Sequence, residues 1–329
     1  MLSYTLRRLA GLLFVLLAIC VVTFGIFYIL PSDPALQACG KSCTTERIEQ
    51  LHHQMGLDKP LWQQFVDYLG GIVGGRTLGT GELAVKCEFP CLGFSYQMNR
   101  PVWELLLDRL PTTASIAAGA AVLWLLFGLT AGVISALRKG TVLDRSLMAG
   151  TLTAASLPVY FTGLVALYLV VQLAGWLPFP SYVELTESPI AWAQNLLLPW
   201  AVLALLYAAM YARLSRSSML ETLAEPYIRT ARAKGLPERT VVVKHAMRSA
   251  LTPVITIFGM DLATLLGGAV ITESVFGLPG VGQLTINAIN TADQPVVMGV
   301  ALLSAFLITG FNVVVDVLYA VADPKVRQS

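Results

Sequence analysis

The chain has 329 residues, of which 56% are hydrophobic and only 13% are charged, and its formal net charge is +2. Soluble domains average about 25% charged residues. This composition therefore excludes an ordinary soluble protein and favours one whose apolar surface is solvated by lipid. The basic residues lie beside apolar stretches rather than in a basic domain, so we expect no nucleic-acid partner.

Six apolar stretches are long enough to cross a membrane as helices, which requires about 20 residues each. They are about Leu9–Leu30, Thr113–Leu137, Leu147–Leu173, Leu196–Leu214, Pro253–Ile271 and Val296–Val321. The first stretch exceeds the roughly 7–15 residue apolar core of a signal peptide and has no small-residue cleavage site, so we expect it to be retained. Interior prolines such as Pro158 and Pro199 are compatible with spanning helices. The sequence thus predicts an all-α polytopic membrane protein with six transmembrane helices.

Lysine and arginine are concentrated at the two termini and in alternate loops, whereas the loops Trp176–Asn195 and Glu273–Pro295 contain neither. Because cytoplasmic loops are enriched in these residues, the pattern predicts that both termini are cytoplasmic. The predicted parts of the chain are a first transmembrane helix (1–30), an extracytoplasmic segment (31–108), a transmembrane core (109–322) and a cytoplasmic tail (323–329).

The extracytoplasmic segment carries four cysteines in two close pairs, Cys39 with Cys43 and Cys87 with Cys91. In an oxidising compartment they predict two disulfides rather than a metal site, with three possible pairings that the sequence does not distinguish. A four-thiolate zinc site and free thiols are the alternatives. Cys20 lies in the first apolar stretch, where we expect an inert thiol.

Two short helices and a loop are also expected in this segment. The residues from Thr44 to Leu51 start like a capped helix, and Leu61–Leu69 shows helical apolar spacing. The glycine-rich stretch Gly70–Gly81 is typical of a loop.

The loop between the fourth and fifth apolar stretches predicts a short helix bracketed by helix breakers. Pro226 suits the first turn, and Gly235 followed by Pro237 suits the end. Ile228, Ala231 and Gly235 share one face, which is small enough for another surface to approach closely, and the remaining face is basic. The alternative interpretation is an ordinary basic loop that contacts anionic lipid.

This loop resembles the cytoplasmic coupling segment of ABC importer permeases, and specifically that of the dipeptide/oligopeptide branch. The resemblance rests on Arg229–Leu236, followed by His245–Arg248 and Leu251–Pro253, with Arg229 where other branches have Glu. Further motifs of the same family occur in the same order along the chain, at Leu30–Pro34, Gly56–Leu61, Arg109–Thr113, Glu273–Gly282, Asp293–Val296 and Ala322–Arg327. Ser32 replaces the usual Gly, and the two cysteine pairs are not part of the family pattern.

The resemblance implies a B-type permease subunit with the type I ABC importer transmembrane fold, in the cell's inner membrane. It implies that the coupling helix, at about 221–237, contacts an ATPase through Glu225, Tyr227, Ile228, Arg229, Ala231, Arg232 and Gly235. The implied partners are a second homologous permease, two cytoplasmic ATPase subunits or domains, an extracytoplasmic substrate-binding protein and membrane lipid.

The chain itself has no Gly-x-x-x-x-Gly-Lys-Ser/Thr phosphate cradle. We therefore expect no catalytic residue and no cofactor here, with ATP and Mg bound by the ATPase partners. The resemblance favours small peptides as the substrate, with nickel or glutathione as alternatives. A secondary transporter or channel is the alternative from another class, but the sequence shows neither inverted repeats nor a filter-like loop.

Three acidic residues are candidates for the translocation path. Asp261 and Asp316 lie inside predicted spans, where an ionised Asp costs about 2.5–3.5 kcal/mol and must face protein or water. Either they line the path and meet a peptide amino group, or they bond to neighbours within the bundle, and we favour the second interpretation. Glu273 starts the loop Glu273–Pro295, which exceeds the usual connection length and predicts a structured or functional insert.

Overall fold

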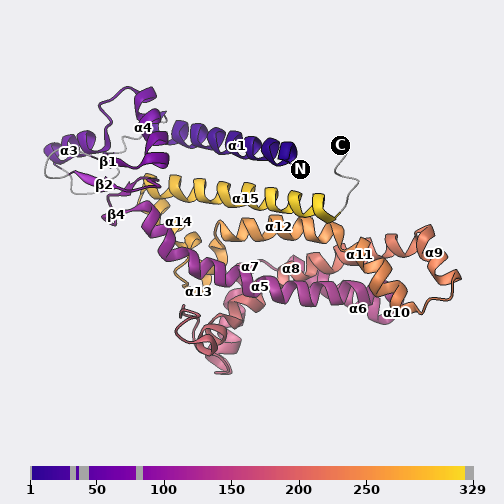
Figure 1. Cartoon of the computed structure of the whole chain (residues 1–329). Coiled ribbons are helices and arrows are strands. Elements are labelled where there is room, and N and C mark those ends of the chain that lie inside the picture. Colours follow the sequence, from indigo (N-terminus) through magenta and orange to yellow (C-terminus); the bar gives the residue numbers. More distant parts are fainter. Residues whose placement is uncertain (1, 30–34, 37–43, 79–83, 323–329) are drawn as a thin grey trace. The chain divides into compact units, whose positions relative to one another are not determined.

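The computed structural model describes residues 2–29, 35–36, 44–78 and 84–322 (Figure 1). The chain divides into two compact units. We call Met1–Pro111, Leu266–Val270 and Pro279–Ser329 the terminal unit, and Thr112–Leu265 with Ile271–Leu278 the central unit.

The terminal unit is built on two long helices, α1 (Leu2–Ile29) and α15 (Gln294–Ala322), which lie side by side (Figure 1). Its other helices are α3 (Thr45–Met55), α4 (Leu61–Gly74) and α14 (Val281–Asn290). Two antiparallel hairpins pair β1 (Arg76–Leu78) with β2 (Val85–Cys87) and β3 (Phe94–Ser95) with β4 (Arg100–Pro101).

The core of the terminal unit forms where α1, α4, α14, α15 and the first turns of α5 (Val102–Leu137) meet. Phe24 of α1 packs edge-on against Phe65 of α4, with ring centroids 5.2 Å apart. A glycine on α15 permits the contact with α5, because a Cβ atom at Gly299 would lie 2.4 Å from a methyl carbon of Val102. These apolar side chains pack closely together in the core of the unit.

The sequence predictions for the segment after α1 are confirmed in part. Helices α3 and α4 occupy the predicted positions, but α4 continues to Gly74 and β1 lies within the predicted loop Gly70–Gly81. A disulfide joins Cys87 to Cys91, with Cα atoms 5.5 Å apart. Cys39 and Cys43 lie outside the described residues, and Cys20 is a buried free thiol.

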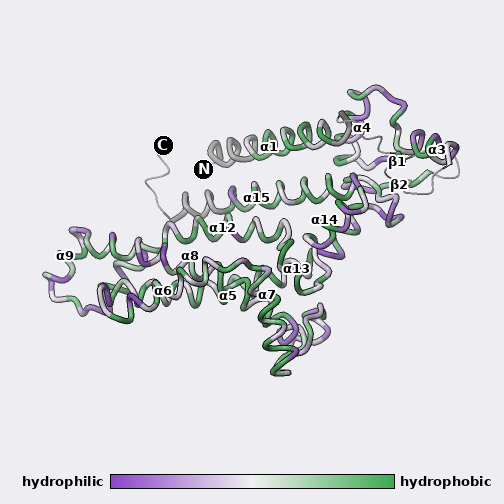
Figure 2. Tube along the Cα trace, turned by 180° about the vertical axis from the view of Figure 1, so that it is seen from behind, coloured by the Kyte–Doolittle hydropathy of each residue, from purple (hydrophilic) through white to green (hydrophobic). Residues whose placement is uncertain are grey.

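The central unit contains the rest of α5 and a series of helices that follow it. They are α6 (Val142–Ser156), α7 (Val159–Ala166), the π-helix η2 (Leu167–Leu173), α8 (Pro189–Ala224), α9 (Pro226–Ala233), α10 (Glu238–Thr240), the π-helix η3 (Val241–Ala246), α11 (Met247–Ala250), α12 (Thr252–Leu266) and α13 (Val270–Phe276). Hydrophobic residues line most of α5, α8 and α12, whereas hydrophilic residues cluster around α9 (Figure 2).

Small residues let α5 and α8 pack closely within this unit. A Cβ atom at Gly119 would lie 2.0 Å from the Trp200 ring, and one at Gly132 would lie 2.2 Å from the Ser215 hydroxyl oxygen. The indole N–H of Trp200 donates to the Ser115 carbonyl at 2.9 Å. Helices in membranes associate through such small-residue contacts because lipid supplies no hydrophobic driving force between them.

The predicted count of six spans is not confirmed. In the part of the chain that the structure describes, α5, α8 and Gln294–Val314 of α15 are long and apolar enough to cross a membrane. Two bent pairs, Val142–Ser156 with Val159–Leu173 and Glu238–Ala250 with Thr252–Leu266, raise the number to at most five. In α1 the segment Ala10–Ile26 is apolar but shorter than the length required of a span.

Two predicted stretches are interrupted at local breakers. The third bends by 97° at Pro158, because proline disfavours a helical backbone in the residue before it, and Leu157 is extended at φ −89° and ψ 127°. The fifth ends at Leu266 rather than Ile271, since Gly268 has φ +133° and separates α12 from α13. Pro199, by contrast, lies inside the continuous helix α8, as expected.

Candidate ATPase-coupling site

Helix α9 occupies the loop in which the sequence predicts a short bracketed helix, and its bounds confirm that prediction. Pro226 is its first residue, where the missing N–H of proline costs no hydrogen bond. At its end Gly235 has φ +77°, its N–H donates to the Arg232 carbonyl at 2.9 Å, and the N–H of Leu236 donates to the Ala231 carbonyl at 3.4 Å. This pair of bonds is a Schellman motif, which requires a left-handed residue at the position of Gly235.

The small face of α9 packs against the chain itself. Ile228 is 0% exposed and Ala231 is 9% exposed. Both belong to an apolar cluster formed with α5, α8, η3 and α11, whose other buried members are Ala136, Met219, Val241, Val242, Ala246 and Ala250. Helical spacing predicts which residues share this face, but the surface that approaches it is the chain's own.

The opposite face of α9 is open and basic. Tyr227 is 45% exposed, and Arg229 and Lys234 are also exposed. Figure 1 shows α9 and α10 at one end of the central unit. A helix that is anchored by one face and free on the other is suited to carry a displacement between a partner and the helices beneath it.

An exposed ion pair closes the turn between α9 and α10. The Arg232 guanidinium donates two hydrogen bonds to the Glu238 carboxylate, from Nη2 to Oε1 at 2.6 Å and from Nε to Oε2 at 3.1 Å. Glu238 could not be identified from the sequence as a partner of Arg232, because a spacing of six residues across Gly235 and Pro237 matches no helical pattern.

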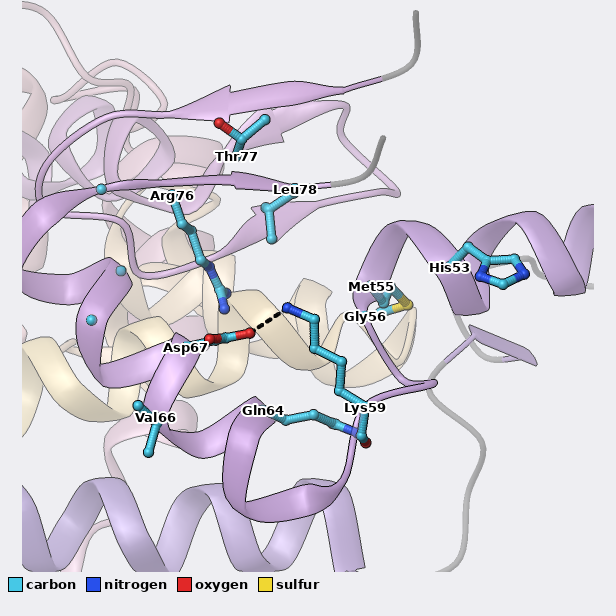
Figure 3. Close-up of a pocket in the computed structure, with 13 residues that line it drawn as sticks. His53, Met55, Gly56, Lys59, Gln64, Val66, Asp67, Arg76, Thr77 and Leu78 are labelled. Carbon is cyan, nitrogen blue, oxygen red and sulfur yellow. Dashed lines mark hydrogen bonds and ion pairs between the residues drawn. The ribbon is translucent and has the colours of Figure 1, made fainter. Parts of the chain in front are cut away.

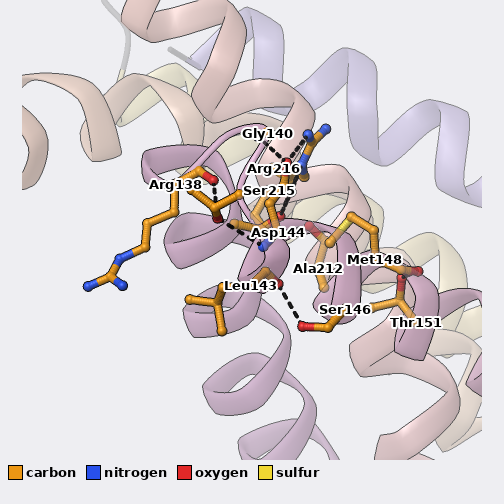
Figure 4. Close-up of polar contacts among 12 residues, drawn as sticks. Arg138, Gly140, Leu143, Asp144, Ser146, Met148, Thr151, Ala212, Ser215 and Arg216 are labelled. Carbon is orange, nitrogen blue, oxygen red and sulfur yellow. Dashed lines mark hydrogen bonds and ion pairs between the residues drawn. The ribbon is translucent and has the colours of Figure 1, made fainter.

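A second, more buried ion pair supports the helix that leads into α9. Arg216 of α8 donates to both carboxylate oxygens of Asp144 in the first turn of α6, at 2.8 and 2.9 Å (Figure 4). The same carboxylate accepts bonds from the Ser135 hydroxyl of α5 and, at 2.9 Å, from the N–H of Gly140. One carboxylate thus joins α5, α6 and α8 just before α8 leads into α9.

The candidate residues of the translocation path have different surroundings. Glu273 on α13 is 0% exposed and accepts a hydrogen bond from the Thr113 hydroxyl at 2.8 Å. Asp261 on α12 is half-buried and accepts one from the Tyr211 hydroxyl at 2.8 Å. Asp316 lies on α15, and its side chain is outside the described residues.

The loop that begins at Glu273 is structured, because it contains most of α13 and all of α14. Near the end of the loop lies Asp293, whose buried carboxylate accepts a hydrogen bond from the Ser95 hydroxyl. Burial raises the pKa of Asp293, and the hydrogen bonds from Ser95 and the Val296 backbone offset part of that increase.

A separate open cleft lies in the terminal unit, with a volume of about 580 Å³. Lys59 and Asp67 form an ion pair across it at 2.5 Å, and Arg76 extends into it from β1 (Figure 3). The Arg76 guanidinium also lies over the Tyr68 ring, 5.5 Å from its centroid. None of these residues belongs to the predicted site.

Comparison with known proteins places the chain among the membrane subunits of ABC importers. Two family models match it: the N-terminal part of the binding-protein-dependent transport system membrane component over residues 1–117, and the binding-protein-dependent transport system inner membrane component over residues 128–328. The chain belongs to this family. It is a multi-pass membrane protein and a transport subunit rather than an enzyme, and the importer to which it belongs includes ATPase partners.

Several relatives are similar over their full length. The chain is 36% identical to a putative peptide transport system permease protein of Brucella abortus, covering 99% of both chains. It is 37% identical to the di/tripeptide transport system permease protein DppB of Pseudomonas aeruginosa, and 34% identical to the dipeptide transport system permease protein DppB of Escherichia coli K12, with 99% coverage of each chain in both cases.

The fold has a counterpart among solved structures. An inward-facing conformation of the MetNI methionine ABC transporter superposes with a TM-score of 0.53, covering 67% of this chain and 97% of that chain at 17% identity. At this identity the likeness shows the fold alone, and it confirms the ABC importer transmembrane fold that the sequence predicts.

Proposed function

We propose that this chain is the B-type permease subunit of an ATP-driven importer that moves small peptides across the inner membrane. The observation that carries the proposal is the identity of 34–37% to peptide and dipeptide permeases over 99% of the chain. Because the matches cover 99% of the chain, they include the coupling loop and the outer segment as well as the transmembrane helices.

The open face of α9 is the proposed contact with an ATPase partner. Tyr227, Arg229 and Arg232 are exposed on it, whereas Ile228 and Ala231 face inward and connect it to α8 and η3. ATP-driven movement of the ATPases would displace α9, and the buried face would pass that displacement to the spanning helices. A short packed helix transmits such a movement without absorbing it in its own flexibility.

The remaining partners and the orientation are part of the same proposal. A second homologous permease completes the pathway, and an extracytoplasmic binding protein delivers the peptide. Both termini and α9 lie on the cytoplasmic side, which is supported by the lysines and arginines in the loops on that side. ATP and Mg are bound by two ATPase subunits or domains.

Uptake by the reconstituted importer tests the proposed function. The complete complex in proteoliposomes, with its binding protein outside, is expected to accumulate labelled dialanine when ATP is inside. A non-hydrolysable ATP analogue is the matched control and should abolish accumulation. Accumulation of nickel but not of dialanine, or dialanine uptake that does not depend on ATP, would contradict the proposal.

A further inference from the structure

Asp261 lies inside the apolar helix α12. It is half-buried, and its hydrogen bond comes from the Tyr211 hydroxyl on α8 at 2.8 Å. No ion pair within the described ranges involves Asp261. Carboxylates at membrane depth are costly unless they face protein or water, and they are often part of a substrate or ion path.

Aromatic rings from α5, α8 and α12 pack together next to Asp261. Trp124 of α5 stacks on Tyr207 of α8, with ring centroids 4.7 Å apart and ring planes inclined by 26°. Tyr211 and Phe258 complete the group, with centroids 6.0 and 6.1 Å from that of Trp124. Through the Tyr211 hydroxyl this aromatic group is joined directly to Asp261. Aromatic faces attract cations, and they do so most strongly where water is excluded.

A row of threonines marks the accessible face of α12. Thr252, Thr256 and Thr264, together with the exposed Met260, recur every four residues. The three hydroxyls donate to backbone carbonyls four residues earlier, at 3.4, 3.3 and 2.9 Å. Thr264 lies three residues beyond Asp261, so these two side chains are neighbours on the helix surface.

We propose that the part of α12 around Asp261 and Thr264 lines the translocation path and that Asp261 receives the terminal ammonium group of the peptide, beside the rings of Tyr207 and Tyr211. The inference rests on the proposed function and names the substrate contact within it. The ammonium group is shared by free peptides whatever their side chains, so it is a suitable contact for a permease that carries varied sequences. Because Tyr211 already donates to Asp261, the contact is weak enough for the peptide to leave.

The contrast with Glu273 supports the choice of residue. Glu273 is fully buried and accepts a hydrogen bond from Thr113, so its carboxylate is closed to a substrate. Asp261 is the described intramembrane carboxylate that combines partial exposure with neighbouring aromatic rings and no cation.

Saturation-transfer NMR on the whole importer in nanodiscs, without binding protein, tests the inference. The probes are dialanine and N-acetyl-dialanine, which differ in the ammonium group. We expect wild-type protein to bind dialanine about tenfold more tightly, as is typical of a hydrogen bond to a charged group. Asp261→Asn should abolish this preference, and Asp261→Glu should retain most of it.

Two further variants separate recognition from structure. Tyr211→Phe removes the hydroxyl that bonds to Asp261 but keeps the charge and the ring, so the preference for dialanine should survive. Thr264→Lys places a cation one turn from Asp261 and should abolish the preference even if Asp261→Asn does not assemble. Equal binding of the two peptides by the wild type, binding of neither, or an unchanged preference in Asp261→Asn or Thr264→Lys would overturn the inference. Dialanine uptake is measured in parallel, and it tests the proposed function independently of the inference about Asp261.

Discussion

Two arginine–carboxylate pairs with nearly the same bonding lie in different regions of the central unit. Arg216 and Asp144 join three helices, and their side chains are 26% and 6% exposed. Arg232 and Glu238 close the turn after α9, and their side chains are 42% and 59% exposed. A similar two-bond geometry therefore has different consequences, because exposed pairs are screened by water whereas a buried charge that loses its partner cannot be solvated.

The largest expected effect is the loss of the arginine at the helix junction. Arg216→Ala leaves the Asp144 carboxylate buried without its cation, and we expect the melting temperature of the purified chain to fall by about 5–10 °C. Replacing both residues by leucine should be milder, since no unpaired charge remains. A melting temperature within error of the wild type for Arg216→Ala would remove the distinction between the two pairs.

A backbone change at the end of α9 should have an intermediate effect. Gly235 has φ +77°, and a Cβ atom there would meet nothing within 4 Å, so strain rather than crowding decides the outcome. Gly235→Ala is expected to cost about 1–2 kcal/mol in the free energy of unfolding. Gly235→Asn should cost less, because Asn tolerates the left-handed region. Denaturant titration of both variants checks this order, and equal losses would contradict it.

Asp293 of the terminal unit extends the comparison to a buried carboxylate with no ion pair within the described ranges. Burial raises its pKa, so the folded chain holds this proton more tightly than the unfolded chain. The stabilisation from this group is therefore present at low pH and is lost as pH rises through the folded pKa. Melting curves should show that the melting temperature of the wild type rises relative to that of Asp293→Asn as pH is lowered from neutral toward the ordinary pKa range of Asp. A difference independent of pH would contradict this assignment.

The smallest effect is expected at the exposed pair. Arg232→Ala should lower the melting temperature by less than about 2 °C, because an exposed ion pair contributes little. The melting temperature of this variant is also expected to change little when salt is added. A loss as large as that of Arg216→Ala would show that burial does not separate the two regions.

Local signals in the sequence predicted local structure well. Pro226 and Gly235 act on their own backbone, so the bounds of α9 follow from them. Pro158 and Pro199 show the limit of prediction from local sequence, because Pro158 lies at a bend whereas Pro199 lies inside a continuous helix. Whether a membrane helix accommodates a proline depends on neighbouring helices, which local sequence does not specify.

Contacts between residues that are far apart along the chain could not be predicted from the sequence. Asp144 and Arg216 are separated by 72 positions, and Thr113 and Glu273 by 160. No periodicity links such pairs, although a charged residue beside an apolar stretch indicates that a partner is needed. The face of α9 was predictable from helical spacing, but the cluster that covers Ile228 and Ala231 was not.

The central claim is that the open face of α9 couples this permease to its ATPases. The most direct measurement is the number of dialanine molecules taken up per ATP hydrolysed by the reconstituted importer carrying Arg229→Glu, with Lys139→Glu as a matched exposed control in the loop between α5 and α6. We expect Arg229→Glu to lower this ratio at least about tenfold, since a charge reversal across an interface opposes docking, and Lys139→Glu to leave it unchanged. A wild-type ratio for Arg229→Glu would contradict the account.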